Sequence, residues 1–288
     1  MSDTDAITGS PVRRGSQSNR APPDTAQQEP SFELHLQPIV DLSDNQARSA
    51  ESLLRLRDPV RGLVHPDEFL PAASMVDARV GIDSLVVEQS CDVVMMLRQR
   101  AYDTRLSLNM FTSTLMEAGF ADHVLGICEQ KGVDPSAFSI EVLETCDARR
   151  VTPSMFRNLD ILRDSGMHLQ LDDVVMSPTA HVNIGHFKPD GIKLDKSLIS
   201  GDRFNGDHET IADSPSKWAN AFSLMRAARN HDLEVTAEGV ETEDQLDIVR
   251  RLGCNRAQGF LFSPAMRPDR FCDFVAGKDV DEPTPFSP

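Results

Sequence analysis

The stretch Gly166–Asp173 reads GMHLQLDD and sets the pattern from which the rest of the chain is interpreted. Apolar and polar residues alternate along it, as in a short β-strand, and it ends on two adjacent carboxylates. Adjacent carboxylates repel each other, so such a pair usually persists because a cation lies beside it or because one carboxylate holds a proton. Taken alone, Asp172 and Asp173 can equally be the N-cap and turn before a helix. Recurrence of the same pattern along the chain favours the cation.

Strand-like runs of this kind recur along the chain and are separated by amphipathic helical patterns, for example at 84–98 and 241–252. We count eight: Phe32–Val40, Ser49–Leu56, Arg105–Phe111, Phe138–Glu144, Met167–Asp173, Gly191–Lys196, Glu234–Val240 and Arg256–Phe262. Eight strands alternating with helices predict an α/β protein, a TIM-like (β/α)8 barrel in a single domain. The domain is expected over residues 31–276. Residues 1–30 and the tail 277–288 are rich in polar residues and proline, which predicts disorder.

Composition excludes several function classes. The formal net charge of -16 argues against general binding of DNA, RNA or anionic membranes. No apolar run approaches the length of about 18 residues that a membrane span needs. The five cysteines are scattered without CxxC spacing, which is typical of reduced thiols in a cytoplasmic protein rather than of a zinc site or disulfides.

Polar residues lie in or at the ends of seven consecutive predicted strands, where a barrel enzyme carries its reactive groups. They are Glu51 with Arg55, Asn109, Glu141 with Glu144, Asp172 with Asp173, Lys193, Glu238 with Glu241, and Gln258. Each one alone has a structural explanation, as a solvated strand end, an ion-pair partner or a satisfied core amide. Their recurrence favours a site, and oxygen ligands without a histidine or cysteine cluster indicate Mg2+ or Mn2+ rather than zinc.

These motifs give residues 32–276 a specific resemblance to the EAL-domain family of cyclic di-GMP phosphodiesterases. The matching segments are Leu36–Val40, Glu51–Arg55, Arg61–Val64, Leu108–Asn109, Ile140–Glu144, Leu171–Asp173, Ile192–Asp195, Ala237–Thr242 and Ala257–Phe262. The resemblance implies a TIM-like barrel whose first strand is antiparallel to the rest. It also implies two-metal hydrolysis of cyclic di-GMP to linear pGpG, which lowers a second messenger in bacterial signalling.

The resemblance further implies roles for individual residues. The expected metal ligands are Glu51, Asn109, Glu141, Asp172, Asp173 and Glu238, of which Glu51, Asp173 and Glu238 are also counted as catalytic. Lys193 resembles the lysine that contacts the attacking water. The residues expected to bind substrate are Arg55, Gln37, Pro38, Leu54 and Gln258. Glu144 and Glu241 resemble residues that support loops.

The chain departs from the family pattern after Asp173. A glycine-rich loop, Phe-Gly-Thr-Gly-Tyr-Ser-Ser, is usual there, whereas this chain has Val174–Ala180, without glycine or aromatic residues. Fewer backbone conformations are open to it, so weaker binding of the second metal is expected, and its part in a homodimer is in doubt. Two alternatives therefore stay open: a cyclic di-GMP receptor without turnover, and a module that binds a regulatory protein partner.

Overall fold

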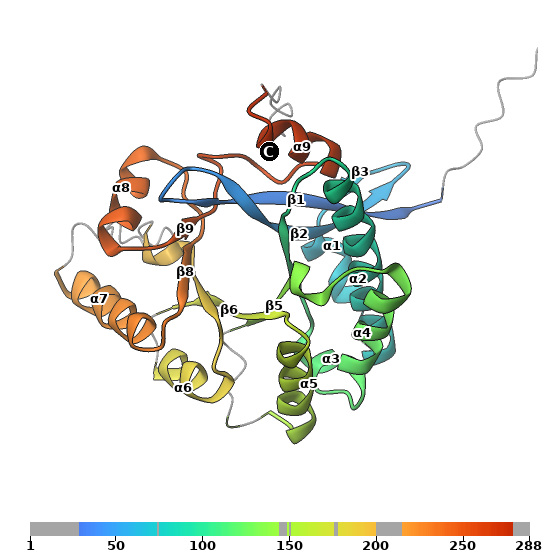
Figure 1. Cartoon of the computed structure of the whole chain (residues 1–288), viewed down its shortest axis with the longest axis horizontal. Helices are drawn as coiled ribbons and strands as arrows, with labels where there is room; N and C mark the ends of the chain where they lie inside the picture. Colours follow the sequence, from blue (N-terminus) through green and yellow to red (C-terminus); the bar gives the residue numbers. More distant parts are fainter. Residues whose placement is uncertain are drawn as a thin grey trace, which may run out of the picture.

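The computed structural model of the protein describes residues 29–73, 75–143, 149, 151–175, 178–199 and 215–278. Its strands form a closed barrel surrounded by helices (Figure 1). The strands are β1 (Ser31–Asp41), β2 (Ala47–Asp58), β3 (Gly62–Val64), β4 (Arg105–Asn109), β5 (Phe138–Leu143), β6 (His168–Val174), β7 (Gly191–Leu194), β8 (Glu234–Ala237) and β9 (Arg256–Ala257). The predicted TIM-like barrel is confirmed.

The sheet runs in the order β1-β9-β8-β7-β6-β5-β4-β2-β3, and pairing of β1 with β2 closes the ring. From β2 through β4 to β9 the ring neighbours are parallel, whereas β1 is antiparallel to both β2 and β9. The antiparallel first strand is therefore confirmed. The short strand β3 was not predicted; it pairs with the far end of β2 as an antiparallel hairpin outside the ring.

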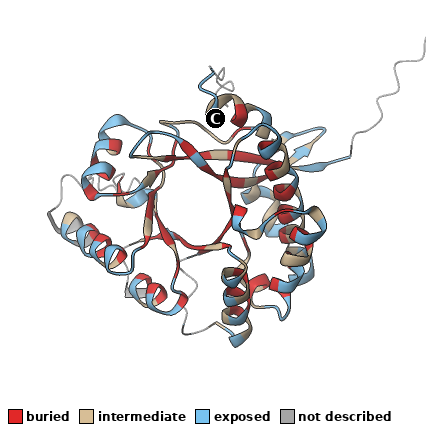
Figure 2. Ribbon diagram, in the orientation of Figure 1, coloured by how far each residue is buried: buried red, intermediate tan, exposed pale blue. Residues whose placement is uncertain are grey.

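Helices cover the outside of the barrel (Figure 1). They are α1 (Pro66–Phe69), α2 (Val76–Gln99), α3 (Thr112–Leu115), α4 (Phe120–Lys131), α5 (Pro153–Asp164), α6 (Pro178–Phe187), α7 (Pro215–Asn230), α8 (Glu243–Leu252) and α9 (Pro268–Val275), with 3-10 turns η1 (Leu70–Ala72), η2 (Pro135–Ala137) and η3 (Lys196–Leu198). Buried residues line the strands and the inward helix faces (Figure 2). In the described part of the chain, no helix is both long and apolar enough to span a membrane.

Local signals set the helix ends. Helix α8 begins with a capping box, in which the Thr242 side chain accepts from the Gln245 backbone N–H and the Gln245 side chain accepts from the Thr242 backbone. It ends on Gly253, whose φ of 86° is the left-handed conformation that glycine adopts without steric cost. The ends predicted to be disordered are residues 1–30 and 277–288; of these, only 29–30 and 277–278 belong to the described residues, so the disorder stays a prediction.

Among the parallel strands, β4, β5, β7, β8 and β9 end earlier than predicted on the side that bears the polar residues, whereas β6 runs one residue further, to Val174. Strand β8 stops at Ala237 and β9 at Ala257, so Glu238 and Gln258 follow their strands instead of lying within them. Their backbone stays in the barrel wall, because the Glu238 N–H donates to the Leu194 carbonyl and the Gln258 N–H donates to the Ala237 carbonyl. Their side chains contact Lys193 and Glu51. The polar residues consequently gather above the carboxyl ends of the parallel strands.

Gly259 is expected to be intolerant of any side chain. A Cβ atom there would collide with the backbone of Val240, which is fixed because its N–H donates to the Gln258 carbonyl and its carbonyl accepts from Leu261. Gly259→Ala should therefore lower the free energy of unfolding by at least about 2 kcal/mol in urea denaturation. The matched control is Gly126→Ala in α4, where a Cβ meets nothing within 4 Å and helix propensity predicts a gain of about 0.5–1 kcal/mol. Equal stabilities of the two variants would contradict the assignment.

Candidate active site

Lys193 lies at the centre of a carboxylate cluster at the carboxyl end of the barrel. Its side chain is 1% exposed, and its Nζ lies 2.7 Å from Glu238 Oε1, 3.0 Å from Glu141 Oε1, 3.0 Å from Asp172 Oδ1 and 3.4 Å from Glu51 Oε2. The four carboxylates come from β5, β6, β2 and the residue after β8. One ammonium group thus faces four acids, an excess of negative charge that further cations would relieve.

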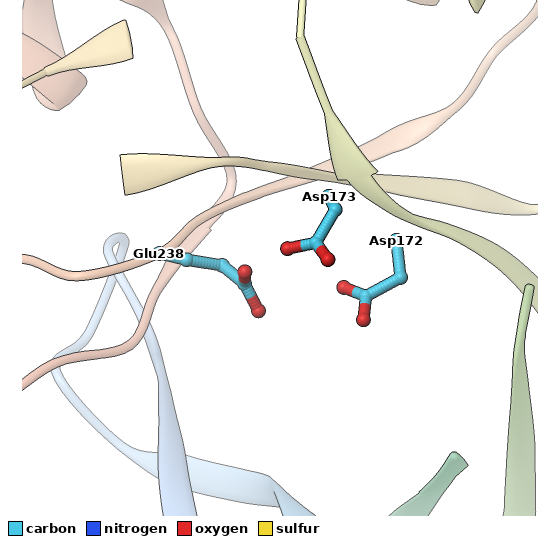
Figure 3. A group of neighbouring side chains, drawn as sticks. All are labelled: Asp172, Asp173 and Glu238. Atoms are coloured by element: carbon cyan, nitrogen blue, oxygen red, sulfur yellow. The ribbon is translucent and has the colours of Figure 1, made fainter. Parts of the chain in front are cut away.

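Asp173 joins this cluster because of an irregularity in β6. Successive strand residues normally point to opposite faces. Here the β6–β7 register shifts between Leu171 and Val174, and Asp173 has a positive φ of 54°. Oxygen atoms of Asp172, Asp173 and Glu238 consequently lie within 4.8 Å of one another, and the three carboxyl groups face a common space (Figure 3).

Amide side chains hold Glu51 in place. Asn109 Nδ2 donates to Glu51 Oε1 at 2.7 Å, and Gln258 Nε2 donates to Glu51 Oε2 at 2.7 Å. Gln258 Nε2 also donates to Gln37 Oε1 at 3.0 Å. Residues from β1, β2, β4 and the end of β9 are thereby joined across the barrel mouth. These bonds and the charge of Lys193 outweigh burial, so the pKa of Glu51 is below its ordinary value.

Other acids of the cluster are shifted in the opposite direction. Burial, with the charges of Asp172 and Glu51, raises the pKa of Glu238 to about 7 although Lys193 lowers it. Burial and the neighbouring acids raise the pKa of Glu141 well above its usual range, again against Lys193. Burial would lower the pKa of Lys193 itself, but the surrounding carboxylates raise it well above the ordinary value. The lysine is therefore a permanent cation.

The donor set fits divalent metal ions. Glu141 is 2% exposed, and neither of its carboxylate oxygens accepts a directed hydrogen bond from a described residue; the same holds for Asp172 Oδ1. Buried oxygens of this kind are costly unless a cation uses them. All the oxygens are carboxylate or amide, which Mg2+ and Mn2+ prefer.

Two cavities flank the cluster and share Glu51 and Asp172 as wall residues. The larger, of about 650 Å³, lies toward α1, α2 and α3 and is also lined by Leu54, Asn109 and Glu141. The smaller, of about 380 Å³, is lined by residues that include Gln37, Asp173, Glu238, Glu241 and Gln258. With divalent cations held by the carboxylates, an elongated ligand with a central anionic group would place that group at the cations and its ends in the two cavities.

The structure does not bring every predicted site residue to these cavities. Arg55 is buried but lines neither, and its Nη1 donates to the carbonyl of its neighbour Leu54 at 2.9 Å. Pro38 is buried on β1, where it pairs with Ala50. Glu241 is exposed at the rim of the smaller cavity, and Glu144 lies outside the described residues.

The rewritten segment Val174–Ala180 is described only in part. Val174 is fully buried as the last residue of β6 and pairs with Leu194. Helix α6 then begins at Pro178. Met176 and Ser177 lie outside the described residues, so the predicted effects of this segment on metal binding and dimerisation stay predictions.

Several cavity residues were not predicted. Asp195 and Lys196 follow β7 and line the smaller cavity beside Phe260, whose side chain is 68% exposed. The position of Asp195 directly after a strand was the available signal. Arg79 and Asp83 line the larger cavity from α2 and carried no signal, because a barrel pattern directs attention to strand ends.

The buried Asp83 predicts a pH-dependent stability. Burial raises its pKa from 3.8 to about 7, although the Thr114 hydroxyl and the Phe111 N–H donate to it. Below about pH 4 the Asp83 carboxyl is protonated in both the folded and the unfolded chain. Above that pH the unfolded chain releases the proton while the folded protein keeps it, so the free energy of unfolding falls until the pH reaches about 7. Measured by urea denaturation and relative to Asp83→Asn, the free energy of unfolding of the wild type should fall by on the order of 3–4 kcal/mol between about pH 4 and pH 8. A difference independent of pH would refute the shifted pKa.

Comparison with known proteins identifies relatives of the whole barrel. A family model described as "EAL domain" matches residues 23–265. The cyclic di-GMP phosphodiesterase NbdA of Pseudomonas aeruginosa is 30% identical over 81% of this chain and 28% of its own length. The cyclic di-GMP phosphodiesterase PdeL of Escherichia coli is 27% identical over 83% of this chain and 64% of its own length. The chain thus spans less than two thirds of either relative.

Solved structures of other proteins match most of this chain. "PaMucR Phosphodiesterase, c-di-GMP complex" superimposes with a TM-score of 0.73 at 27% identity, covering 83% of this chain and 94% of that chain. The EAL domain of Mycobacterium smegmatis DcpA has a TM-score of 0.69 at 21% identity, covering 87% of this chain and 100% of that chain, which supports the fold.

Proposed function

The chain is a member of the EAL domain family, and from this premise we propose that it hydrolyses cyclic di-GMP to linear pGpG with Mg2+ or Mn2+. The observation that carries the proposal is the carboxylate cluster around Lys193, two of whose members, Glu51 and Asp172, line both cavities. Cyclic di-GMP has two guanosine units around a central phosphodiester ring. Two cavities on either side of a metal-binding cluster match that shape.

The proposed metal ligands are Glu51, Asn109, Glu141, Asp172, Asp173 and Glu238. Bound divalent cations would lower the pKa of a water molecule and neutralise charge on the attacked phosphate. Gln258 and Asn109 hold Glu51 in its orientation through the hydrogen bonds described above. Lys193 Nζ is a hydrogen-bond donor only, and it orients the attacking water.

Substrate contacts are proposed for residues that line the cavities, and for Arg55 and Pro38, which line neither. Leu54 supplies apolar surface in the larger cavity, and Gln37 and Gln258 supply amides in the smaller one. Arg55 is assigned to a ligand phosphate, since among the described residues no carboxylate lies within ion-pair distance of this buried guanidinium. Pro38 is assigned to the support of the neighbouring Gln37 on β1. Glu144 and Glu241 are assigned to loop support.

The test of this function measures turnover and binding together. Purified protein is incubated with cyclic di-GMP and Mn2+ or Mg2+, pGpG is followed by chromatography, and binding is followed by calorimetry. Formation of pGpG that stops on addition of EDTA is the expected result. Binding without product would mean a receptor, and neither binding nor product would mean a protein-interaction module.

We also propose a cytoplasmic location and a homodimer. Four cysteines of the described part, Cys91, Cys128, Cys254 and Cys272, are buried free thiols, as expected in a reducing compartment. Sedimentation of the full chain tests the homodimer. A regulatory protein partner would belong to the alternative without turnover.

A further inference from the structure

A third cavity, with polar walls, lies at the end of the barrel opposite the carboxylate cluster. It has a volume of about 320 Å³, within the range of small-molecule sites. Its wall includes Arg105, the first residue of β4, and Arg256, the first residue of β9. The proposed active site lies above the last residues of the parallel strands, so the two sites face opposite ends of the barrel.

The charge of this cavity is opposite to that of the protein. Its lining residues are Arg48, Ser49, Arg98, Asp103, Thr104, Arg105, Ser136, Ala137 and Arg256. Four guanidinium groups thus face one carboxylate, in a chain whose formal net charge is -16. We call Arg48, Arg98, Arg105 and Arg256 the arginine cluster. Ser49, Thr104 and Ser136 add hydroxyl groups, which donate hydrogen bonds to anions.

Two members of the arginine cluster already have acidic partners. Arg256 holds Glu234 through two contacts of 2.9 Å, and Arg48 pairs with the exposed Asp44. For Arg98 and Arg105, no carboxylate of the described residues lies within ion-pair distance. The nearby Asp190 is engaged elsewhere, since its Oδ2 accepts from the Leu169 N–H at 2.8 Å.

Arg105 is the most unusual member. Its Nη1 lies 3.3 Å from His168 Nδ1, and its Nε is buried with no hydrogen-bond partner among the described residues. Burial, followed by the charge of Arg105, lowers the pKa of His168, so the ring is a neutral acceptor. Burial also lowers the pKa of Arg105, and Arg256 lowers it further while Glu234, Asp190 and Asp103 raise it. An arginine held in this way is costly unless an anion shares its charge.

From this geometry we propose that the arginine cluster binds the diphosphate group of a small molecule. Guanidinium groups match phosphate oxygens with paired hydrogen bonds, which a single lysine charge cannot do. Arg98 and Arg105, which have no acidic partner among the described residues, together with the outer charges of Arg48 and Arg256, suit an anion with several charges better than a singly charged one. The inference does not depend on the proposed phosphodiesterase activity, because it concerns the other end of the barrel.

The test is calorimetric titration of the full chain with inorganic pyrophosphate at constant ionic strength, without divalent metal. The wild type is expected to bind, and both Arg98→Gln and Arg48→Gln are expected to weaken binding at least about tenfold. The matched control is Arg100→Gln, which removes the same charge at the same end of α2 but does not line the cavity, and it should change the affinity less than about twofold.

Absence of pyrophosphate binding at about 10 mM would overturn the proposal. So would equal losses in Arg98→Gln and Arg100→Gln, because these would report a general charge effect. Titration with ADP and GDP distinguishes the source of the diphosphate: tighter binding than that of pyrophosphate indicates a nucleoside diphosphate, and weaker binding indicates the free anion. Arg48 and Arg98 are exposed, so their variants are expected to fold.

Discussion

Lys193→Met is expected to abolish hydrolysis of cyclic di-GMP and to destabilise the metal-free protein. The methionine would leave Glu51, Glu141, Asp172 and Glu238 facing one another without the cation that lies 2.7–3.4 Å from each of them. Loss of one partner of a buried ion pair typically lowers the free energy of unfolding by about 3–5 kcal/mol. Loss of a hydrogen-bond donor to the reacting centre lowers kcat by at least about 10²- to 10³-fold. Both effects are measured on one preparation, by urea denaturation and by the pGpG assay.

Divalent metal separates the two effects. Added Mn2+ should restore part of the stability of Lys193→Met because it supplies the missing positive charge, but it should not restore turnover. The matched control is Lys131→Met, which breaks an exposed ion pair with Asp92 and should leave both properties almost unchanged. Full activity of Lys193→Met would contradict the role assigned to this lysine.

Glu141→Gln is expected to remove metal-dependent stabilisation and at least about 10³-fold of the turnover, since a metal ligand contributes several kcal/mol to the transition state. The amide keeps the shape of the side chain and removes one of the crowded negative charges. The unfolding midpoint without metal should therefore change little, whereas the rise of the midpoint on addition of Mn2+ should disappear. Differential scanning calorimetry with and without the metal measures both.

Glu129→Gln is the matched control for this variant, because it removes the same charge from the exposed face of α4. It should keep the metal-dependent rise and the turnover of the wild type. If Glu141→Gln kept the Mn2+ effect as well, Glu141 would not be a metal ligand, and the burial of its carboxylate, whose Oε1 lies 3.0 Å from Lys193 Nζ, would need another explanation.

The sequence predicted the barrel because its signals are local. Alternating apolar residues marked the strands, and residues such as Thr242 and Gly253 marked the helix ends. The short strand β3 was missed because three residues carry no usable periodicity. The strand ends before Glu238 and Gln258 were placed too late, since the apolar pattern continues beyond the last ladder pair.

The sequence predicted only those site residues whose position follows from the carboxyl end of a strand. Glu51, Glu141, Asp172 and Lys193 come together because parallel strands present their carboxyl ends at one face. The approach of Asp173 depends on a positive φ and a register shift, which the sequence does not reveal. The arginine cluster was not anticipated at all, because its members are far apart in the sequence and meet only when the barrel closes.

In the proposed reaction, water attacks cyclic di-GMP at the carboxylate cluster in the presence of a divalent metal. The most direct measurement is a single-turnover incubation with Mn2+ in isotopically labelled water, with mass spectrometry of the product. We expect pGpG with one labelled oxygen in its new terminal phosphate, and no such product when EDTA is present. Absence of pGpG, or pGpG formed without the label, would contradict it.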